Sequence, residues 1–340
     1  MLYLSRADVA ACGITPARMN DVVEAVFLAE AQGTAWTQPK LALFRPDGNS
    51  FRAKAGATTD PSYGAVKWFG YFPGNADRGL PDFWPMVILN EGETGFPVAV
   101  MDATWISASR TASVTAAAAR HLARKDAKTV GFIACGTQAR ANLDALAAAF
   151  PLQRVTAYSR NPRTSSAFAE AAAARGLKAI AVTDPRDAVR GHDIVVSSVP
   201  HASPSGRFLD AADVSPGTFV SMVDLGYGWR KETLGRFDRI VTTTSHRAPQ
   251  RIGKAQLRGT LCGGSCRCDR KTHPRTDLGG GAERTDFRRN GSCRRGSGDR
   301  SIRGCLSCRH RYIAAAVRAT MTKRSASQPE TRIQLVDERN

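Results

Sequence analysis

The fold of this 340-residue chain is decided by one stretch, Val130-Gly131-Phe132-Ile133-Ala134-Cys135-Gly136-Thr137-Gln138-Ala139-Arg140. Its four opening residues are typical of a buried strand, and apolar positions 139, 143, 146 and 150 predict a helix directly after it. The small residues between them match the Gly-x-Gly-x-x-Ala layout of a dinucleotide-binding turn, with Ala134 in place of the first glycine. Small residues let a pyrophosphate approach the backbone at a helix N-terminus.

The alternation of strand and helix continues towards residue 224. Further strands are predicted at 155–158, 179–182, 193–199 and 219–223, and a helix at 164–175 that ends before Gly176. Asp184-Pro185 has the form of a helix N-cap followed by a first-turn proline. This order predicts an α/β fold with a Rossmann-type, doubly wound parallel sheet, so we expect residues 121–245 to bind a nicotinamide dinucleotide.

The end of the second predicted strand bears on the choice of cofactor. NAD-binding domains place a carboxylate there for the ribose 2′-hydroxyl, but this strand ends Tyr158-Ser159-Arg160-Asn161. Ser159 and Arg160 suit a 2′-phosphate, which favours NADP over NAD. The alternative is that Arg160 is a solvated loop residue.

Residues 1–120 are predicted to form a mixed α/β domain. Thr15-Pro16 can begin a helix, since threonine is a good N-cap and proline fits the first helical turn. Short strands are expected at 87–89 and 97–101, around a turn at 91–95. The alanine-rich residues 111–124 predict a helix that leads into the next domain.

The net charge of +18 is concentrated in the last part of the chain, since residues 246–340 contain 22 Lys and Arg against 8 Asp and Glu. That segment has two aromatic residues, Phe287 and Tyr312, which are too few for base stacking, so a nucleic-acid partner is not expected.

No apolar run is long enough for a membrane helix. Charged residues at positions 6 and 8 interrupt the N-terminal segment too early for a signal peptide. The two scattered cysteines before residue 246 suit a reducing compartment. A cytoplasmic location is therefore expected.

Several segments resemble the ornithine cyclodeaminase/μ-crystallin family. They are the stretch 130–140 quoted above, Gly64-Ala65-Val66-Lys67-Trp68, residues 73–81 and 93–99, and Ser107-Ala108-Ser109-Arg110-Thr111-Ala112-Ser113. The resemblance runs over about residues 1–242. It implies a homodimer whose N-terminal domain, residues 1–120, serves dimerisation and substrate binding. It also implies an NAD(P)-dependent enzyme that acts at the Cα–N bond of an amino or imino acid, of the ketimine or pyrroline-carboxylate reductase or amino-acid dehydrogenase type.

The resemblance also assigns candidate site residues. Lys67 and Arg110 should face the substrate, with Arg110 suited to a bidentate grip on the α-carboxylate and Lys67 to the same carboxylate or the reacting centre. Lys40 aligns loosely with a carboxylate-binding arginine of relatives. The candidate cofactor-binding residues are Thr111, Cys135, Gly136, Thr137, Gln138, Ser159, Arg160, Ser198 and Val199.

One departure concerns the catalytic aspartate of cyclodeaminases, which lies six residues before a glutamate. Anchoring the motif on Glu232 places Gly226 at that position, and Asp224, two residues earlier, is the nearest candidate for the catalytic role. The departure counts against ornithine cyclisation. A μ-crystallin-like, NADPH-dependent binding protein with little turnover is the alternative from another functional class.

Residues 246–340 leave both the apolar periodicity and the family pattern. We expect this basic tail to be poorly ordered and the Rossmann sheet to lack its final strands. A zinc site is suggested by a group of cysteines and histidines, namely cysteines 262, 266, 268, 305 and 308 with His273 and His310. Their spacing fits no known zinc module, so no metal is expected. A shift of reading frame near codons 243–260 is permitted by the codon table and would make the chain an inactive product.

Overall fold

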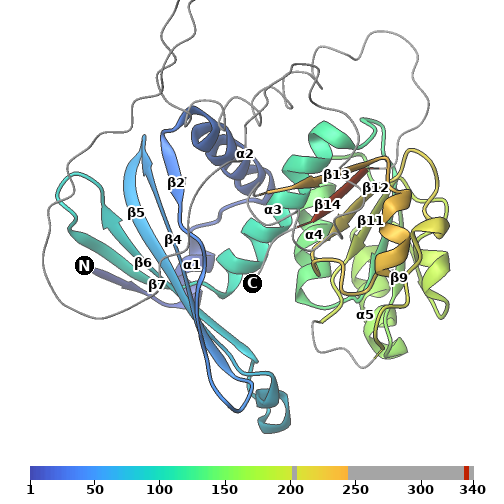
Figure 1. Cartoon of the computed structure of the whole chain (residues 1–340), viewed down its shortest axis with the longest axis horizontal. Helices are drawn as coiled ribbons and strands as arrows, with labels where there is room; N and C mark the ends of the chain where they lie inside the picture. The colour runs from blue at the N-terminus through green and yellow to red at the C-terminus, as the bar shows by residue number, and fades with distance from the viewer. Residues whose placement is uncertain (201–204, 244–332, 337–340) are drawn as a thin grey trace, which may run out of the picture.

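The computed structural model describes residues 1–200, 205–243 and 333–336. Two β-sheets lie on either side of a group of helices (Figure 1). The first sheet is built from residues before 103, and the second begins at residue 129. The expected combination of a mixed α/β unit with a Rossmann sheet is confirmed.

The first sheet is mainly antiparallel. Its strands are β1 (Leu2–Leu4), β2 (Ala35–Thr37), β3 (Leu41–Phe44), β4 (Ser50–Thr59), β5 (Ser62–Tyr71), β6 (Phe83–Glu91) and β7 (Pro97–Asp102). They follow the order β1-β7-β6-β5-β4-β2, β3 also pairs with β4, and β1 runs parallel to β7. The strands predicted at 87–89 and 97–101 are confirmed within β6 and β7.

The second sheet is parallel throughout its described strands. It contains β8 (Thr129–Ile133), β9 (Arg154–Tyr158), β10 (Lys178–Val182), β11 (Ile194–Ser197), β12 (Phe219–Met222), β13 (Arg239–Thr242) and β14 (Ile333–Val336). In the order β10-β9-β8-β11-β12-β14-β13, the chain winds outward from β8 on one side and then from β11 on the other. This reversal is the topological switch point at which doubly wound sheets bind ligands.

The last two strands correct the expectation that the sheet ends without its final strands. β14, from the tail, lies between β12 and β13 and runs parallel to both. The backbone groups on the open edge of β12 are satisfied by this pairing, which gives a physical reason for the extra strands. Residues 333–336 therefore belong to the second sheet, and the rest of the predicted poorly ordered tail lies outside the described residues.

Within the described ranges, five α-helices and four short 3-10 helices connect the strands. They are α1 (Arg6–Ala11), α2 (Pro16–Gln32), α3 (Thr104–Leu122), α4 (Thr137–Ala147), α5 (Pro162–Ala173), η1 (Pro73–Arg78), η2 (Pro185–Ala188), η3 (Ala211–Asp213) and η4 (Lys231–Arg236). Thr15 caps α2 as predicted. Asp184 caps the 3-10 helix η2 with Pro185 in its first turn, as predicted. Ala188, the last residue of η2, and Val189 after it are buried in the core.

Helix α3 lies between the two sheets, and residues 111–117 are buried without interruption. Seven successive buried positions cover every side of a helix, so α3 is a core element and not a surface connector. The Thr115 hydroxyl lies 2.8 Å from that of Ser221 on β12, and Arg124, just past the helix, pairs with Asp193 before β11. Helix α3 thus runs from the carboxyl edge of the second sheet to its amino edge.

Two apolar clusters cover the faces of the second sheet. One contains α3, α4 and α5 residues around Val130 and Phe132, and the other contains Ile133, Trp229 and Phe237. Asn20 of α2 is fully buried and donates to the carbonyl of Ala145 on α4 (2.9 Å), which joins the N-terminal unit to the Rossmann helices. Among the described residues, no helix is long and apolar enough to span a bilayer.

Candidate active site

The turn after β8 is fixed from both sides by the neighbouring strands. The amide of Ala134 donates to the carbonyl of Tyr158 (2.9 Å), and the amide of Cys135 donates to the Ser159 hydroxyl (2.9 Å), both at the end of β9. From the end of β11, the Ser198 hydroxyl donates to the carbonyl of Ala134 (2.9 Å). Parts of the predicted cofactor set, distant in sequence, therefore meet at the switch point.

Ala134 keeps the backbone conformation that glycine normally provides. Its φ of 68° lies in the left-handed region, which costs a non-glycine residue about 1 kcal/mol or more. The Cys135 thiol points away from solvent, 3.3 Å from the carbonyl of Tyr158, and burial raises its pKa to about 11. Cys135 is thus a neutral thiol in the turn, without the thiolate character of a nucleophile.

The start of α4 leaves room for an anionic group. Gly136 is the N-cap residue, no side chain caps the helix, and a Cβ placed on Gly136 would have no atom within 4 Å. Thr137 is exposed beside it, and the buried Oε1 of Gln138 has no hydrogen-bond partner within the described structure. Free amides of an 11-residue helix facing open space fit the pyrophosphate of a dinucleotide.

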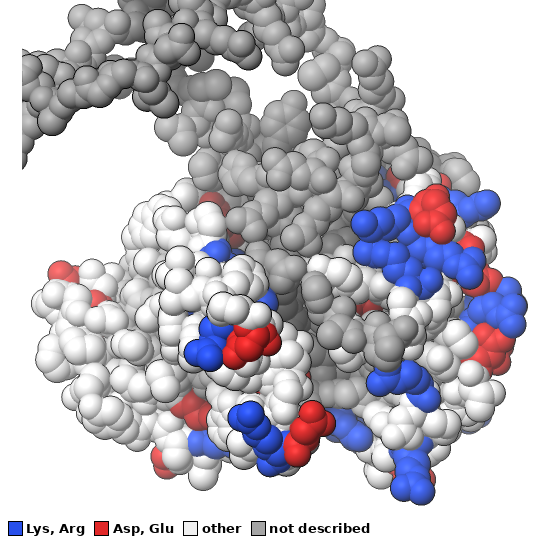
Figure 2. Space-filling view, turned by 60° about the horizontal axis from the view of Figure 1, so that its bottom comes forward, with Lys and Arg blue, Asp and Glu red and all other residues white. Residues whose placement is uncertain are grey.

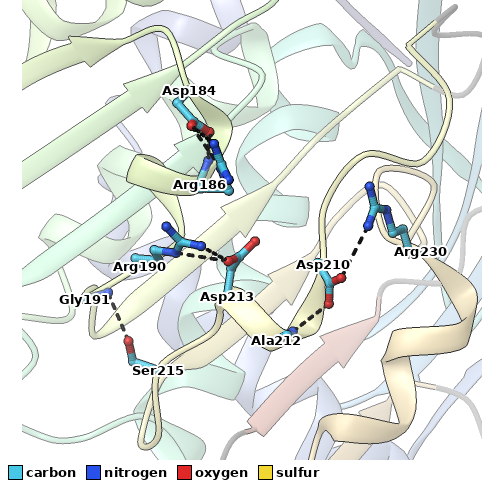
Figure 3. Close-up of polar contacts among 9 residues, drawn as sticks. All are labelled: Asp184, Arg186, Arg190, Gly191, Asp210, Ala212, Asp213, Ser215 and Arg230. Atoms are coloured by element: carbon cyan, nitrogen blue, oxygen red, sulfur yellow. Dashed lines mark hydrogen bonds and ion pairs between the residues drawn. The ribbon is translucent and has the colours of Figure 1, made fainter.

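Arg160 differs from several other arginines of the Rossmann unit. Arg186 forms an ion pair with Asp184 (2.6 Å), Arg190 with Asp213 (2.5 Å) and Arg230 with Asp210 (3.4 Å). Figure 3 draws these three pairs. Arg160 is exposed after β9 and forms no ion pair with the described residues. Its guanidinium charge is thus not neutralised by a neighbouring carboxylate.

Asp224 lies in a buried turn after β12. Its carboxylate accepts hydrogen bonds from the Ser197 hydroxyl (3.1 Å), the Val199 amide (3.2 Å) and the Gly226 amide (3.0 Å). Burial raises the pKa of this carboxyl group to about 6, against the opposing effect of these donors. These contacts hold the β12 turn against the end of β11. They give Asp224 a structural role that the sequence did not indicate.

Two of the substrate-binding candidates lie on strand β5 and on helix α3, which are joined by a hydrogen bond. Lys67 on β5 donates to the Ser107 hydroxyl of α3 (3.1 Å), and its ammonium lies 5.1 Å from the ring centre of Phe69. Arg110 follows Ser107 by one turn of α3 and is half-buried. The Thr111 hydroxyl is buried and donates to the carbonyl of Ser107 (2.8 Å).

Lys40 lies between β2 and β3, also half-buried. Sequence reasoning missed Ser107, Ser197 and Trp229 as supporting residues, although the indole of Trp229 donates to Ser197 (2.9 Å) inside the Asp224 network. Hydroxyls inside apolar strands and helices give no local pattern from which such contacts can be read. No metal-binding group occurs among the described residues, and the cysteines considered for zinc lie outside them.

The fold and the switch-point loop define a protein of the NAD(P)-binding Rossmann class with an added mixed α/β unit. The profile of the ornithine cyclodeaminase/mu-crystallin family matches residues 3–235. The chain belongs to this family, as the sequence motifs predicted.

Individual relatives agree with this assignment. An alanine dehydrogenase of Archaeoglobus fulgidus is 35% identical over 222 residues, which cover 65% of this chain and 66% of that relative, slightly less than two thirds of its length. The solved archaeal alanine dehydrogenase dimer with bound NAD superposes with a TM-score of 0.66 at 32% identity, over 73% of this chain and 76% of that one. The structure of the Thermococcus litoralis Δ1-pyrroline-2-carboxylate reductase, in complex with NADH and L-proline, superposes with a TM-score of 0.66 at 26% identity. The match covers 72% of this chain and 76% of that one.

Proposed function

We propose that this protein is an NAD(P)-dependent oxidoreductase acting at the Cα–N bond of an amino or imino acid. The observation that carries the proposal is the open N-terminus of α4 at the switch point, together with Arg110 on α3 and Lys67 bonded to the same helix. A bound nicotinamide cofactor supplies or takes up the hydride. The named relatives are dehydrogenases and reductases of such substrates.

The direction of α3 supports a shared site for cofactor and substrate. Thr115 lies at the end of β12 through its contact with Ser221, whereas Arg124 lies near the start of β11. Arg110 precedes Thr115 by more than one helical turn, so it projects beyond the carboxyl edge of the sheet, on the side of the cofactor loop. There Arg110 would hold the α-carboxylate and Lys67 would pair with it or polarise the reacting centre.

Turnover assays separate this proposal from a binding protein without activity. Purified full-length protein is mixed with NADPH or NADH and with Δ1-pyrroline-2-carboxylate, Δ1-piperideine-2-carboxylate or a 2-oxo acid plus ammonia, and absorbance at the nicotinamide band is followed. Saturable cofactor oxidation supports the enzyme. Tight cofactor binding without oxidation in any assay, or in the reverse direction with amino acids, would favour the μ-crystallin-like alternative.

For the cofactor we propose a preference for NADP. Arg160 is exposed after β9, next to Ser159, and pairs with no acidic residue in the part of the chain that the structure describes. Arg160→Ala is expected to weaken NADPH binding about tenfold, because one charge-assisted hydrogen bond to the 2′-phosphate is lost. NADH binding should be unchanged. Fluorescence titration of both cofactors tests this. Arg186→Ala is the control, because that guanidinium is already paired with Asp184. Equal affinity of the wild type for both cofactors would rule out the preference.

We also propose a homodimer formed through the outer face of the first sheet. Trp36, Leu41, Leu43, Trp84 and Met86 share that face by strand register and are 45–57% exposed. Figure 2 shows few charged side chains over the first unit and many over the Rossmann unit. Such an apolar face is typical of a subunit interface.

Trp84→Glu is therefore expected to convert the dimer to a monomer, because it places a charge in the buried centre of the interface. Light scattering after size exclusion measures the mass. Ile180→Glu is the matched control, since Ile180 is 55% exposed on β10 of the other sheet. A wild-type monomer, or a Trp84→Glu dimer as stable as the wild type, would contradict the interface.

The location we propose is the cytoplasm, since Cys12 and Cys135 are both free thiols.

A further inference from the structure

Three lysines lie in one row across the first sheet. Lys54 on β4 is the direct cross-strand partner of Lys67 on β5. On the other side of β4, Gln38 bonds to Ala55 and Leu41 pairs with Ala53, so Lys40, just before β3, lies beside Lys54. Opposed residues of an antiparallel pair project to the same face with Cβ atoms about 5 Å apart.

This row lies on the inner face of the sheet, towards α3. The Lys67 ammonium donates to Ser107 of α3, and Phe69, two residues along the same face, is buried. Arg52 shares the face, with its guanidinium over the rings of Phe44 and Tyr71 (5.6 and 5.5 Å). In Figure 1 β4 and β5 run side by side along this unit.

No negative charge within the described structure balances Lys54. It is half-buried and forms no ion pair with residues 1–200 or 205–243. The carboxylates at the ends of β6 and β7 are engaged elsewhere, because Glu91 accepts from the amide and hydroxyl of Thr94 and Asp102 accepts from the amide of Thr104. Like charges directly opposite each other destabilise a sheet, so the placement of Lys54 opposite Lys67 is unfavourable unless an anion lies near Lys54.

We propose that the substrate carries a second carboxylate and that Lys54 binds it. This inference rests on the proposed function, in which Arg110 and Lys67 hold the α-carboxylate. With Arg110 and Lys67 on the α-carboxylate, a monocarboxylic amino acid leaves Lys54 without an anion from the substrate. A dicarboxylic amino or imino acid can lie with its α-carboxylate at α3 and its distal carboxylate towards β4.

The test compares ligands that differ only in the distal group. Glutarate and pentanoate have the same number of carbons, and each is titrated by calorimetry into the full-length protein saturated with NADPH. We expect glutarate to bind the wild type about tenfold or more tightly than pentanoate. Lys54→Met keeps the length of the side chain and should weaken glutarate binding about 10- to 100-fold, with pentanoate changed less than about twofold. Lys54→Arg should retain the preference, which guards against a folding defect in the methionine variant.

Lys178→Met is the matched control, because Lys178 is exposed at the start of β10 in the other unit. Equal effects of Lys54→Met on both ligands, or no effect on either, would overturn the proposal. A loss of NADPH affinity with glutarate binding intact would also overturn it, since the row would then serve a cofactor phosphate. Turnover of 2-oxoglutarate and 2-oxopentanoate with ammonia is measured in parallel. Binding that depends on Lys54 without turnover of either acid would leave the second-carboxylate site standing and refute the oxidoreductase.

Discussion

Replacing Arg110 by lysine is expected to lower kcat/KM for a carboxylate substrate about 10- to 100-fold, mainly through KM, because lysine keeps the charge but loses the planar fork. Arg110 lies one turn after Ser107, the residue that Lys67 contacts, so the change is made on the part of α3 that Lys67 approaches. Steady-state kinetics with the best substrate from the turnover assays, together with cofactor titration, measure the effect.

Cofactor affinity should stay within about twofold of the wild type, since the proposed role of Arg110 is towards the substrate alone. Arg175→Lys serves as the control, because Arg175 is exposed and pairs with Asp144 on the surface of the Rossmann unit. An unchanged KM in Arg110→Lys would refute the carboxylate role, whatever happens to kcat.

The second large effect is on stability. Asp224→Ala removes the acceptor for the Ser197 hydroxyl and for the Val199 and Gly226 amides, and Asp224 is only 7% exposed. Leaving buried donors unpaired is expected to lower the free energy of unfolding by about 3 kcal/mol at pH 7. Urea denaturation followed by circular dichroism measures it. A loss below about 1 kcal/mol would mean that solvent reaches these donors.

The same group predicts a pH dependence with a definite sign. The pKa of Asp224 is raised to about 6 in the folded protein, above its unfolded value. The pH-dependent part of its contribution to stability, which adds to that of its hydrogen bonds, is therefore full below pH about 4 and is lost as the pH rises through about 6. The stability difference between wild type and Asp224→Ala should therefore be larger at pH 5 than at pH 8, by about 1 kcal/mol. A difference that grows with pH would contradict the raised pKa.

The sequence predicted the strands that are apolar throughout and failed where the strands are mixed. The predicted strands β8, β9, β11 and β12 are largely buried, so their apolar runs are continuous, whereas β10 at the edge of the sheet is partly exposed. The hairpin of β4 and β5 was missed because small residues and the cations Arg52, Lys54 and Lys67 interrupt the alternation. No local pattern could have predicted β14, because its partners β12 and β13 lie about 90 residues or more earlier in the chain.

The site could be predicted as a set of residues but not as a set of contacts. The turn at 134–136 was recognised from its small residues, and the structure adds that Ser159 and Ser198 hold it. For Asp224, motif spacing suggested catalysis, which stays a prediction, and the fold adds the hydrogen-bond donors around its carboxylate. Burial and partners distant in the chain decide such roles, and neither can be read from spacing.

The continuous burial of residues 111–117 in α3 has a kinetic consequence. Swinging the two units apart would expose this helix on one side and break the contact between Thr115 and Ser221, so wide opening of the molecule is costly at every stage of a catalytic cycle. Ligands must then enter and leave by movement of loops at the rim of the site. Turnover should accordingly depend little on solvent viscosity, in contrast to enzymes that close one domain over another for each substrate molecule.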